Sequence, residues 1–160
     1  MIITRLIGGM GNQMFQYAAG RALATRLGVP LRVDRRAFDT YQVHAYSLQH
    51  FAANIQDAVP DNLPGAGCES RLGRYLRRFA FATKPVRRVV TEKAFTFDHE
   101  VLELPDGCYL DGYWQSEKYF EDAAEVVRRD FVIKTPPDAV NSGWLEQIRA
   151  VQAVSIHVRR

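Results

Sequence analysis

The fold is decided by residues 2–34, which read IITRLIGGMGNQMFQYAAGRALATRLGVPLRVD. Residues 2–7 form a short apolar run typical of a buried strand, and the glycine turn of residues 8–11 follows at once. Residues 12–27 then show apolar side chains at every fourth position, which predicts a helix that lays one stripe on a sheet. The stripe consists of Phe15, Ala19, Leu23 and Leu27, flanked by Met14, Ala18 and Ala22.

The end of this helix and the strand after it complete a β-α-β unit. Gly28 suits the left-handed position that closes a helix, and Pro30 cannot continue one. Residues 31–34 are the second strand, so the connection is short and implies parallel pairing with a right-handed crossover. The sequence therefore predicts an α/β fold with a Rossmann-like parallel sheet flanked by helices.

The rest of the chain continues this alternation of strands and helices. Strands are expected over residues 86–90, 108–114 and 153–158, and helices over residues 116–130 and 144–151. The last of these strands runs to the end of the sequence, and domains rarely stop on a core strand. We therefore expect the chain to be a fragment of a longer protein.

Composition and charge narrow the class of protein. A chain of 160 residues with 47% apolar and 24% charged residues is typical of one globular domain. The net charge of +3 does not favour nucleic acid, so no such partner is expected. Cys68 and Cys108 lie outside any C-x-x-C pattern or His cluster, so neither a disulfide framework nor a metal site is expected. No apolar stretch is long enough for a signal peptide or anchor, which favours a cytoplasmic location.

The glycine turn is the first candidate site. Backbone N–H groups in such a turn can approach an anion, and the dipole of the following helix favours negative charge there. Gly9 and Gly11 are the residues in question. Two alternatives stay open. One is a tight structural turn. The other is the dinucleotide fingerprint G-x-G-x-x-G, in which Met14 takes the place of the third glycine; Asp34, at the end of the second strand, supports this alternative.

Two amide side chains, Asn12 and Gln13, follow the turn. They supply donors and acceptors for phosphate or sugar oxygens, which favours a ligand site over a purely structural turn. For Asn12 the alternative role is to cap the helix, which its side chain does well.

Three stretches of the sequence form a further pattern. They read GGMGNQMFQYA at residues 8–18, DGYWQSEKYF at residues 111–120 and SIHVRR at residues 155–160. The first two resemble signatures of glycosyltransferase family 11, the α-1,2-fucosyltransferases, and the third resembles the start of that family's H-x-R-R-G-D motif. The matches occur in the family's order and span almost the whole chain.

This resemblance implies a GT-B architecture, in which two α/β domains face each other across a cleft and the C-terminal one holds most of GDP-fucose. Residues 1–151 would be the acceptor-side domain, and residues 152–160 would be the first strand of the second. It also implies an inverting, metal-independent transfer of L-fucose from GDP-β-L-fucose to the 2-hydroxyl of a galactose-terminated glycan, with no cofactor. Because half of the cleft would be missing, we expect no transfer by these 160 residues alone.

The resemblance also assigns roles to single residues. Departure of the diphosphate builds negative charge, and a guanidinium stays charged and grips phosphate bidentately. Arg159 would therefore hold the β-phosphate as a catalytic residue, with Arg160 second, and Asn12 would face the phosphate–sugar bond. Because side chains alternate along a strand, His157 would share a face with Arg159 and orient the loop that carries it, although core packing is the favoured role of His157. The alternatives are surface arginines at a strand end and a histidine packed in the core.

Tyr113, Trp114 and Gln115 stand at the carboxyl end of an expected strand, the edge where α/β sheets place ligands. Their aromatic rings suit either stacking on a sugar or packing in the core, and core packing is the favoured role for Trp114.

The segment from Arg71 to Arg88 is rich in arginine and has no acidic residue. Its apolar residues recur at helical spacing opposite the arginines, which predicts an amphipathic basic helix. Such a helix is either a solvated charged face or a peripheral contact with an anionic inner membrane. A third hypothesis for the whole chain follows, in which a non-enzymatic α/β domain binds acidic partners through this helix.

Overall fold

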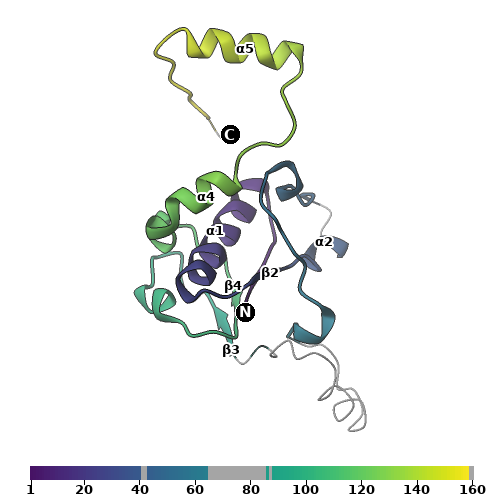
Figure 1. Ribbon diagram of the computed structural model, residues 1–160, viewed down its shortest axis with the longest axis vertical. Coiled ribbons are helices and arrows are strands. Elements are labelled where there is room, and N and C mark those ends of the chain that lie inside the picture. Colours follow the sequence, from purple (N-terminus) through teal and green to yellow (C-terminus); the bar gives the residue numbers. More distant parts are fainter. Residues whose placement is uncertain (41–42, 65–85, 87, 159–160) are drawn as a thin grey trace.

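The computed structural model describes residues 1–40, 43–64, 86 and 88–158, and its centre is a sheet of four parallel strands (Figure 1). The strand order is β2-β1-β4-β3. The strands are β1 (Ile2–Arg5), β2 (Leu31–Asp34), β3 (Arg88–Thr91) and β4 (Cys108–Asp111). Every pairing is parallel, which confirms the predicted α/β fold.

Helix α1 (Met10–Leu27) connects β1 to β2 and begins two residues before the expected position. It closes at Gly28, whose φ of 63° is left-handed, as its position in the sequence predicted. The next residue, Val29, donates its N–H to the carbonyl of Ala24 at 3.0 Å, and the chain turns directly into β2.

Helix α1 is buried on more sides than the single predicted stripe. Ala19 and Leu23 of the stripe are buried, but Leu27 is 37% exposed and the polar side chains of Gln13 and Gln16 are fully buried. The reason is that α1 contacts β1 and β2 on one side, and α4 and several short turns on others. A helix covered from several directions cannot be recognised from one apolar stripe.

The segment after β4 differs from the expected continuous helix over residues 116–130. Two single 3₁₀ turns, Glu117–Tyr119 and Glu121–Ala123, precede helix α4 (Ala124–Asp130). Phe120 separates them with a non-helical backbone, and its ring packs on Phe15 of α1 with the ring centroids 5.9 Å apart. Packing of aromatic side chains against α1 thus overrides the local helical preference.

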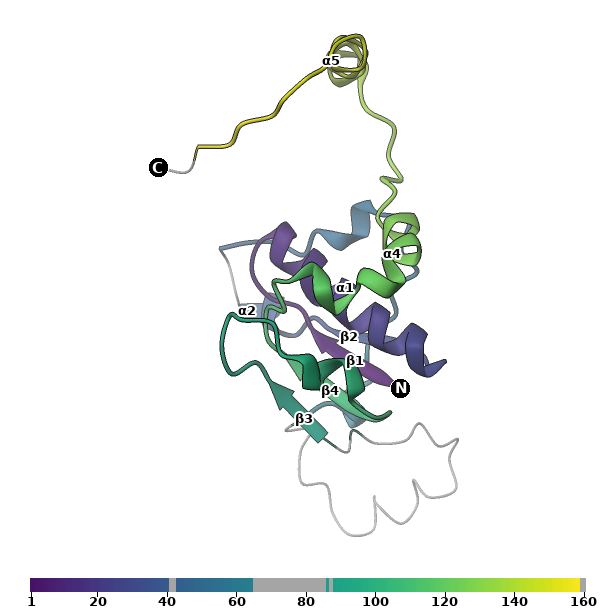
Figure 2. The same ribbon diagram turned by 90° about the vertical axis from the view of Figure 1, so that its left-hand side faces the viewer.

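The remaining elements are short or lie at the end of the chain. Helix α2 (Ala37–Thr40) and 3₁₀ turns at Leu48–His50, Pro60–Asn62 and His99–Glu103 occur within the connections. Helix α5 (Ala139–Arg149) begins earlier than the predicted helix over residues 144–151 and buries none of its residues. Figure 2 shows it standing apart from the sheet and α1.

The expected strand over residues 153–158 is wrong for this structure. The segment is not part of the sheet, and Val154, Ile156 and Val158 are 86%, 83% and 76% exposed. A strand needs a neighbour to pair with, and none of the described strands lies beside this segment. The division into domains at residues 151 and 152 stays a prediction.

Some expectations fall on residues outside those described. The basic stretch from Arg71 to Arg88 is among them, apart from Val86 and Arg88, and so are Arg159, Arg160 and Cys68. Among the described residues, no helix combines the length and the hydropathy that crossing a bilayer requires.

Candidate functional site

The first two sequence motifs meet at the carboxyl edge of the sheet. The loop after β1 leads into α1, and the loop after the neighbouring strand β4 carries Gln115. The side-chain amide of Gln115 donates to Oδ1 of Asn12 at 2.6 Å, although the two residues are 103 positions apart. The carboxyl ends of parallel strands are where α/β sheets place ligands, so this contact marks the candidate site.

The glycine turn at this edge exposes the start of α1. Gly9 is the N-cap of the helix and has no side chain to cap it, and the first turn holds no acidic residue. The N–H groups of a first helical turn have no intrahelical partner. Gly11 lies in this turn and is exposed. No atom of the described residues lies within 4 Å of the position that its Cβ would take. The turn therefore presents an uncapped helix N-terminus with room for an anion.

The structure corrects the role expected for Gln13. Its side chain is completely buried, and its amide donates to the carbonyls of Gly8 at 2.8 Å and Ala45 at 3.0 Å. Its carbonyl oxygen accepts the N–H of Ser47 at 2.8 Å. Both amide hydrogens are used inside the protein, so Gln13 holds the glycine turn against residues 45–47 and does not offer its amide to a ligand.

Asn12 occupies the third position of α1, so the alternative role as the helix N-cap is wrong. Its side chain is half-buried and packs so closely against the turn that a Cβ added to Gly8 would lie 2.7 Å from Asn12 Nδ2.

The imidazole of His44 also lies beside the turn, and its nearest atoms are 3.7 Å from the position that a Cβ of Gly9 would take. Nothing in the sequence near His44 indicated this position, because it depends on the packing of a connection against the turn.

Asp34 argues against the dinucleotide alternative. Its carboxylate is 4% exposed and accepts hydrogen bonds from the Tyr109 hydroxyl at 2.7 Å and the Arg36 guanidinium at 2.8 Å. Burial disfavours the charged form, but these hydrogen bonds outweigh it and hold the pKa of Asp34 below its ordinary value. An acidic residue that binds a ribose must have an oxygen available for its hydroxyl groups, whereas both oxygens of Asp34 already accept hydrogen bonds inside the protein.

Glu92 shapes the loop after β4, and sequence reasoning missed it. Its carboxylate accepts the backbone N–H of Tyr113 at 2.7 Å and that of Trp114 at 3.0 Å. Trp114 has a left-handed backbone with φ of 54°, which is unfavourable for a bulky residue. Gly112 is required beside it, because an added Cβ would collide with Glu92. The Glu92 carboxylate therefore fixes the loop that carries Gln115.

The structure separates the roles of the two aromatic residues in this loop. Trp114 is 1% exposed and packs edge-on against Tyr119, with the ring centroids 5.7 Å apart, which confirms core packing as its role. Tyr113 is only partly buried, and its ring contacts Phe95. Tyr113 is thus available at the edge of the sheet and Trp114 is not.

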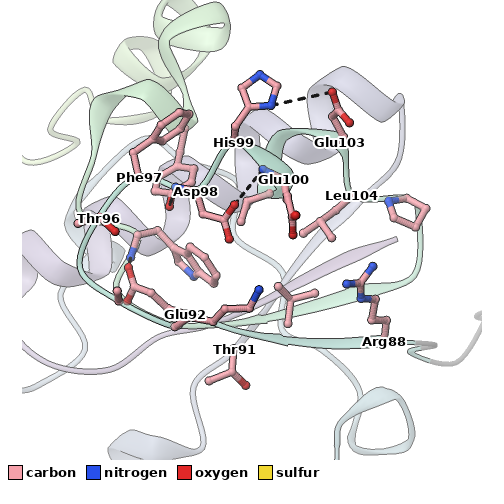
Figure 3. A pocket seen from close by; sticks show the side chains of 17 residues that line it. Arg88, Thr91, Glu92, Thr96, Phe97, Asp98, His99, Glu100, Glu103 and Leu104 are labelled. Carbon is pink, nitrogen blue, oxygen red and sulfur yellow. Dashed lines mark hydrogen bonds and ion pairs between the residues drawn. The ribbon is translucent and has the colours of Figure 1, made fainter.

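Among the cavities near this edge, two are lined by residues of the loops and strands just described. The larger, of about 580 Å³, lies between β3 and the turn His99–Glu103 (Figure 3). It is lined by the rings of Phe97, Trp114 and Tyr119 and by carboxylates, of which Asp98 accepts the N–H of Glu100 at 3.0 Å. The smaller, of about 330 Å³, is lined by the Arg5–Asp111 ion pair together with Asp34 and Tyr109. Both volumes fall in the range of small-molecule pockets.

The described part of the third motif, residues 155–158, is not brought to this site. His157 is exposed on the segment after α5, which Figure 2 shows apart from the sheet, and Arg159 and Arg160 lie outside the described residues. The predicted alignment of His157 with Arg159 requires a strand, but residues 153–158 are not paired with any described strand. Their roles stay predictions. Within the described part of the chain, no three His, Cys, Asp or Glu side chains are grouped to hold a metal ion.

We expect Gly8→Ala to lower the free energy of unfolding by about 1–3 kcal/mol in urea titrations. The φ of Gly8 is 83°, and the added methyl group would press on Asn12. Gly11→Ala is the matched control, since it adds the same methyl group to a helical position with open space. It should leave the stability unchanged or raise it by up to about 1 kcal/mol. Equal losses in the two variants would contradict this account of the turn.

Comparison with known proteins gives one relative over the whole chain. The sequence is 28% identical over 163 aligned residues to a curated protein of Escherichia coli, alpha-1,2-colitosyltransferase. The alignment includes 100% of this chain and 54% of the relative, so the chain spans about half the length of that protein. No family model matches the chain, and no solved structure shows significant similarity to it. The chain is thus similar throughout to part of a glycosyltransferase.

Proposed function

We propose that this chain is the acceptor-side half of a glycosyltransferase that uses a nucleotide-activated sugar as donor and a glycan as acceptor. The observation that carries the proposal is the hydrogen bond between Asn12 and Gln115. It joins two motifs that are distant in sequence, at the edge of the sheet and beside an uncapped helix N-terminus. The similarity of the whole chain to part of a curated glycosyltransferase supports the same class.

The finer form of the proposal is transfer of L-fucose from GDP-β-L-fucose to the 2-hydroxyl of a galactose-terminated glycan, with inversion and without a metal. The three motifs support the family, and the name of the E. coli relative specifies the same α-1,2 linkage but a different sugar, colitose.

The chemistry divides between this chain and a second domain. The uncapped turn at Gly9 and Gly11 and the amide of Asn12 would face the phosphate–sugar bond of the donor. Arg159, with Arg160, would stabilise the charge that develops on the departing diphosphate. We propose that the second domain begins near residue 152. Gln13 and Glu92 would act as positioning residues, because their polar groups are bound to the backbone of the two loops.

A transfer assay tests this function. The gene should be read beyond Arg160, where we expect Gly-Asp, and the longer protein should be assayed with labelled GDP-fucose and with the corresponding colitose donor on lactose. We expect a fucosylated product that an α-1,2-specific fucosidase cleaves, and no turnover by the 160 residues alone. Transfer of colitose but not fucose would overturn the donor and leave the class intact. Absence of transfer from either donor would argue against the class.

Asn12→Ala provides the residue-level test in the longer protein. We expect this variant to lower kcat by about 100-fold, because it removes a preorganised group that acts at the transition state. Asn54→Ala is the matched control, because Asn54 is an exposed asparagine outside the carboxyl edge of the sheet. Equal kcat values for the two variants would remove Asn12 from the catalytic site.

Binding of NAD without binding of GDP-fucose would favour the dinucleotide alternative.

A cytoplasmic location and contact with the inner membrane through Arg71 to Arg88 remain proposals. Co-sedimentation with anionic vesicles at low salt tests the contact, and binding that is unchanged by Arg74→Glu with Arg78→Glu would exclude this segment.

A further inference from the structure

An exposed aromatic pair stands at the same edge of the sheet as the Asn12–Gln115 contact. Phe95 lies in the loop after β3 and is 77% exposed, which is unusual for so large an apolar side chain. Its ring contacts that of Tyr113, with the centroids 6.1 Å apart and the planes tilted by 37°. Two rings from two different loops therefore form one open aromatic surface.

The position of this pair is fixed by the Glu92 carboxylate. Glu92 directly follows β3 and accepts the backbone N–H of Tyr113, so it ties the loop of Phe95 to the loop of Tyr113. Gln115, which holds Asn12, is only two residues beyond Tyr113. A ligand lying on the rings would thus be adjacent to the proposed point of transfer.

Apart from the exposed Lys93, the groups around the pair suit a neutral, hydroxyl-rich ligand. The carboxylate of Glu92 is bound to two backbone N–H groups, and the nearby Asp111 is paired with Arg5 at 2.9 Å. Exposed polar side chains without charge, Thr96 and Gln115, lie in the same two loops. The negative face of an aromatic ring attracts the polarised C–H groups of a pyranose, and amides and hydroxyls bind its hydroxyl groups.

We propose that Phe95 and Tyr113 form the platform on which the terminal sugar of the acceptor glycan stacks. This inference rests on the proposed function and adds the place of the acceptor to it. A nucleobase also stacks on aromatic rings, but it is recognised by a set of directed hydrogen bonds in a slot. This surface is open on one side, and its rings are not parallel. The platform accordingly takes the acceptor sugar.

Nuclear magnetic resonance titration of the 160-residue chain with lactose tests the platform. We expect lactose to shift backbone signals of residues 93–96 and 113–115, and Phe95→Ala to weaken binding roughly 3- to 10-fold. Phe95→Tyr should retain binding. Trp144→Ala is the matched control, because Trp144 is an aromatic residue that is 59% exposed on α5. Phe95→Ala should fold normally, since the side chain makes little buried contact.

The outcomes separate this inference from the proposed function. Lactose shifts elsewhere, or equal affinity in wild type and Phe95→Ala, would overturn the platform. So would a titration in which GDP, not lactose, shifts the signals of Phe95 and Tyr113. In the longer protein, Phe95→Ala should raise the KM for lactose and leave that for GDP-fucose unchanged. If the longer Phe95→Ala protein transfers the sugar with an unaltered KM for lactose, the platform alone is rejected. If lactose binds at Phe95 but the longer wild-type protein transfers no sugar, the proposed function alone is rejected.

Discussion

Gln13→Glu is expected to lower the free energy of unfolding by about 3–5 kcal/mol at neutral pH. The substitution preserves the shape of the side chain but replaces its amide nitrogen by a carboxylate oxygen. That oxygen would face the carbonyl oxygens of Gly8 and Ala45, which now accept the amide hydrogens, in a position with no exposure to solvent. An unpaired buried charge and two carbonyls without donors result. Urea titration followed by circular dichroism measures the loss.

The effect should depend on pH in a defined direction. Burial raises the pKa of the introduced carboxyl group above its unfolded value of about 4.3. The cost is therefore small below that value, where the group is protonated in both states, and it grows as the pH rises through the folded pKa. Gln152→Glu, at an exposed position, is the control and should change the stability by less than about 0.5 kcal/mol. A loss for Gln13→Glu that is equally small would contradict the buried role.

Glu92→Gln should cost about 2–3 kcal/mol, because the two backbone N–H groups of Tyr113 and Trp114 share its carboxylate. A glutamine accepts only one of them, and its amide hydrogens would face the other donor. The left-handed backbone of Trp114 would lose the contacts that hold it. We also expect the side-chain signals of Gln115 to change, since its contact with Asn12 depends on this loop.

Glu103→Gln is the matched control for this prediction. Glu103 is exposed on the turn beside the larger cavity, where it forms a long ion pair with His99 at 4.0 Å. Exposed pairs of this kind contribute little to stability, so a change below about 0.5 kcal/mol is expected. A Glu92→Gln variant as stable as Glu103→Gln, with unaltered Gln115 signals, would show that the loop does not need the carboxylate.

The elements that local periodicity specifies were predicted well. Strand β1, the glycine turn, helix α1 with its end at Gly28, and strand β2 follow one another within a single β-α-β unit. Each depends on neighbours a few residues away in the chain, so the pattern of apolar residues and glycines is sufficient to identify it. The segment over residues 153–158 has the same strand pattern but remains unpaired, because pairing depends on a distant partner.

The candidate site was predicted only in part, and the misses share one cause. Asn12 lies at the turn and its functional role stays a prediction, whereas Gln13 was assigned to a ligand and is bound to residues 45 and 47. Glu92 and Phe95 were not recognised, because their roles require the loops after β3 and β4 to lie together. The spacing of residues in the sequence does not reveal a contact between two loops that are about 20 positions apart.

Local sequence patterns predicted a parallel α/β sheet with a glycine turn at one edge and with Asn12 beside that turn. Local backbone preferences and apolar periodicity suffice for these features. The packed fold was needed to show that Gln13 is internal and that Trp114 lies in the core while Tyr113 is partly exposed. It was also needed to show that Glu92 ties two loops together. The physical reason is that a polar side chain binds whichever backbone groups packing leaves without partners, and packing is a property of the whole fold.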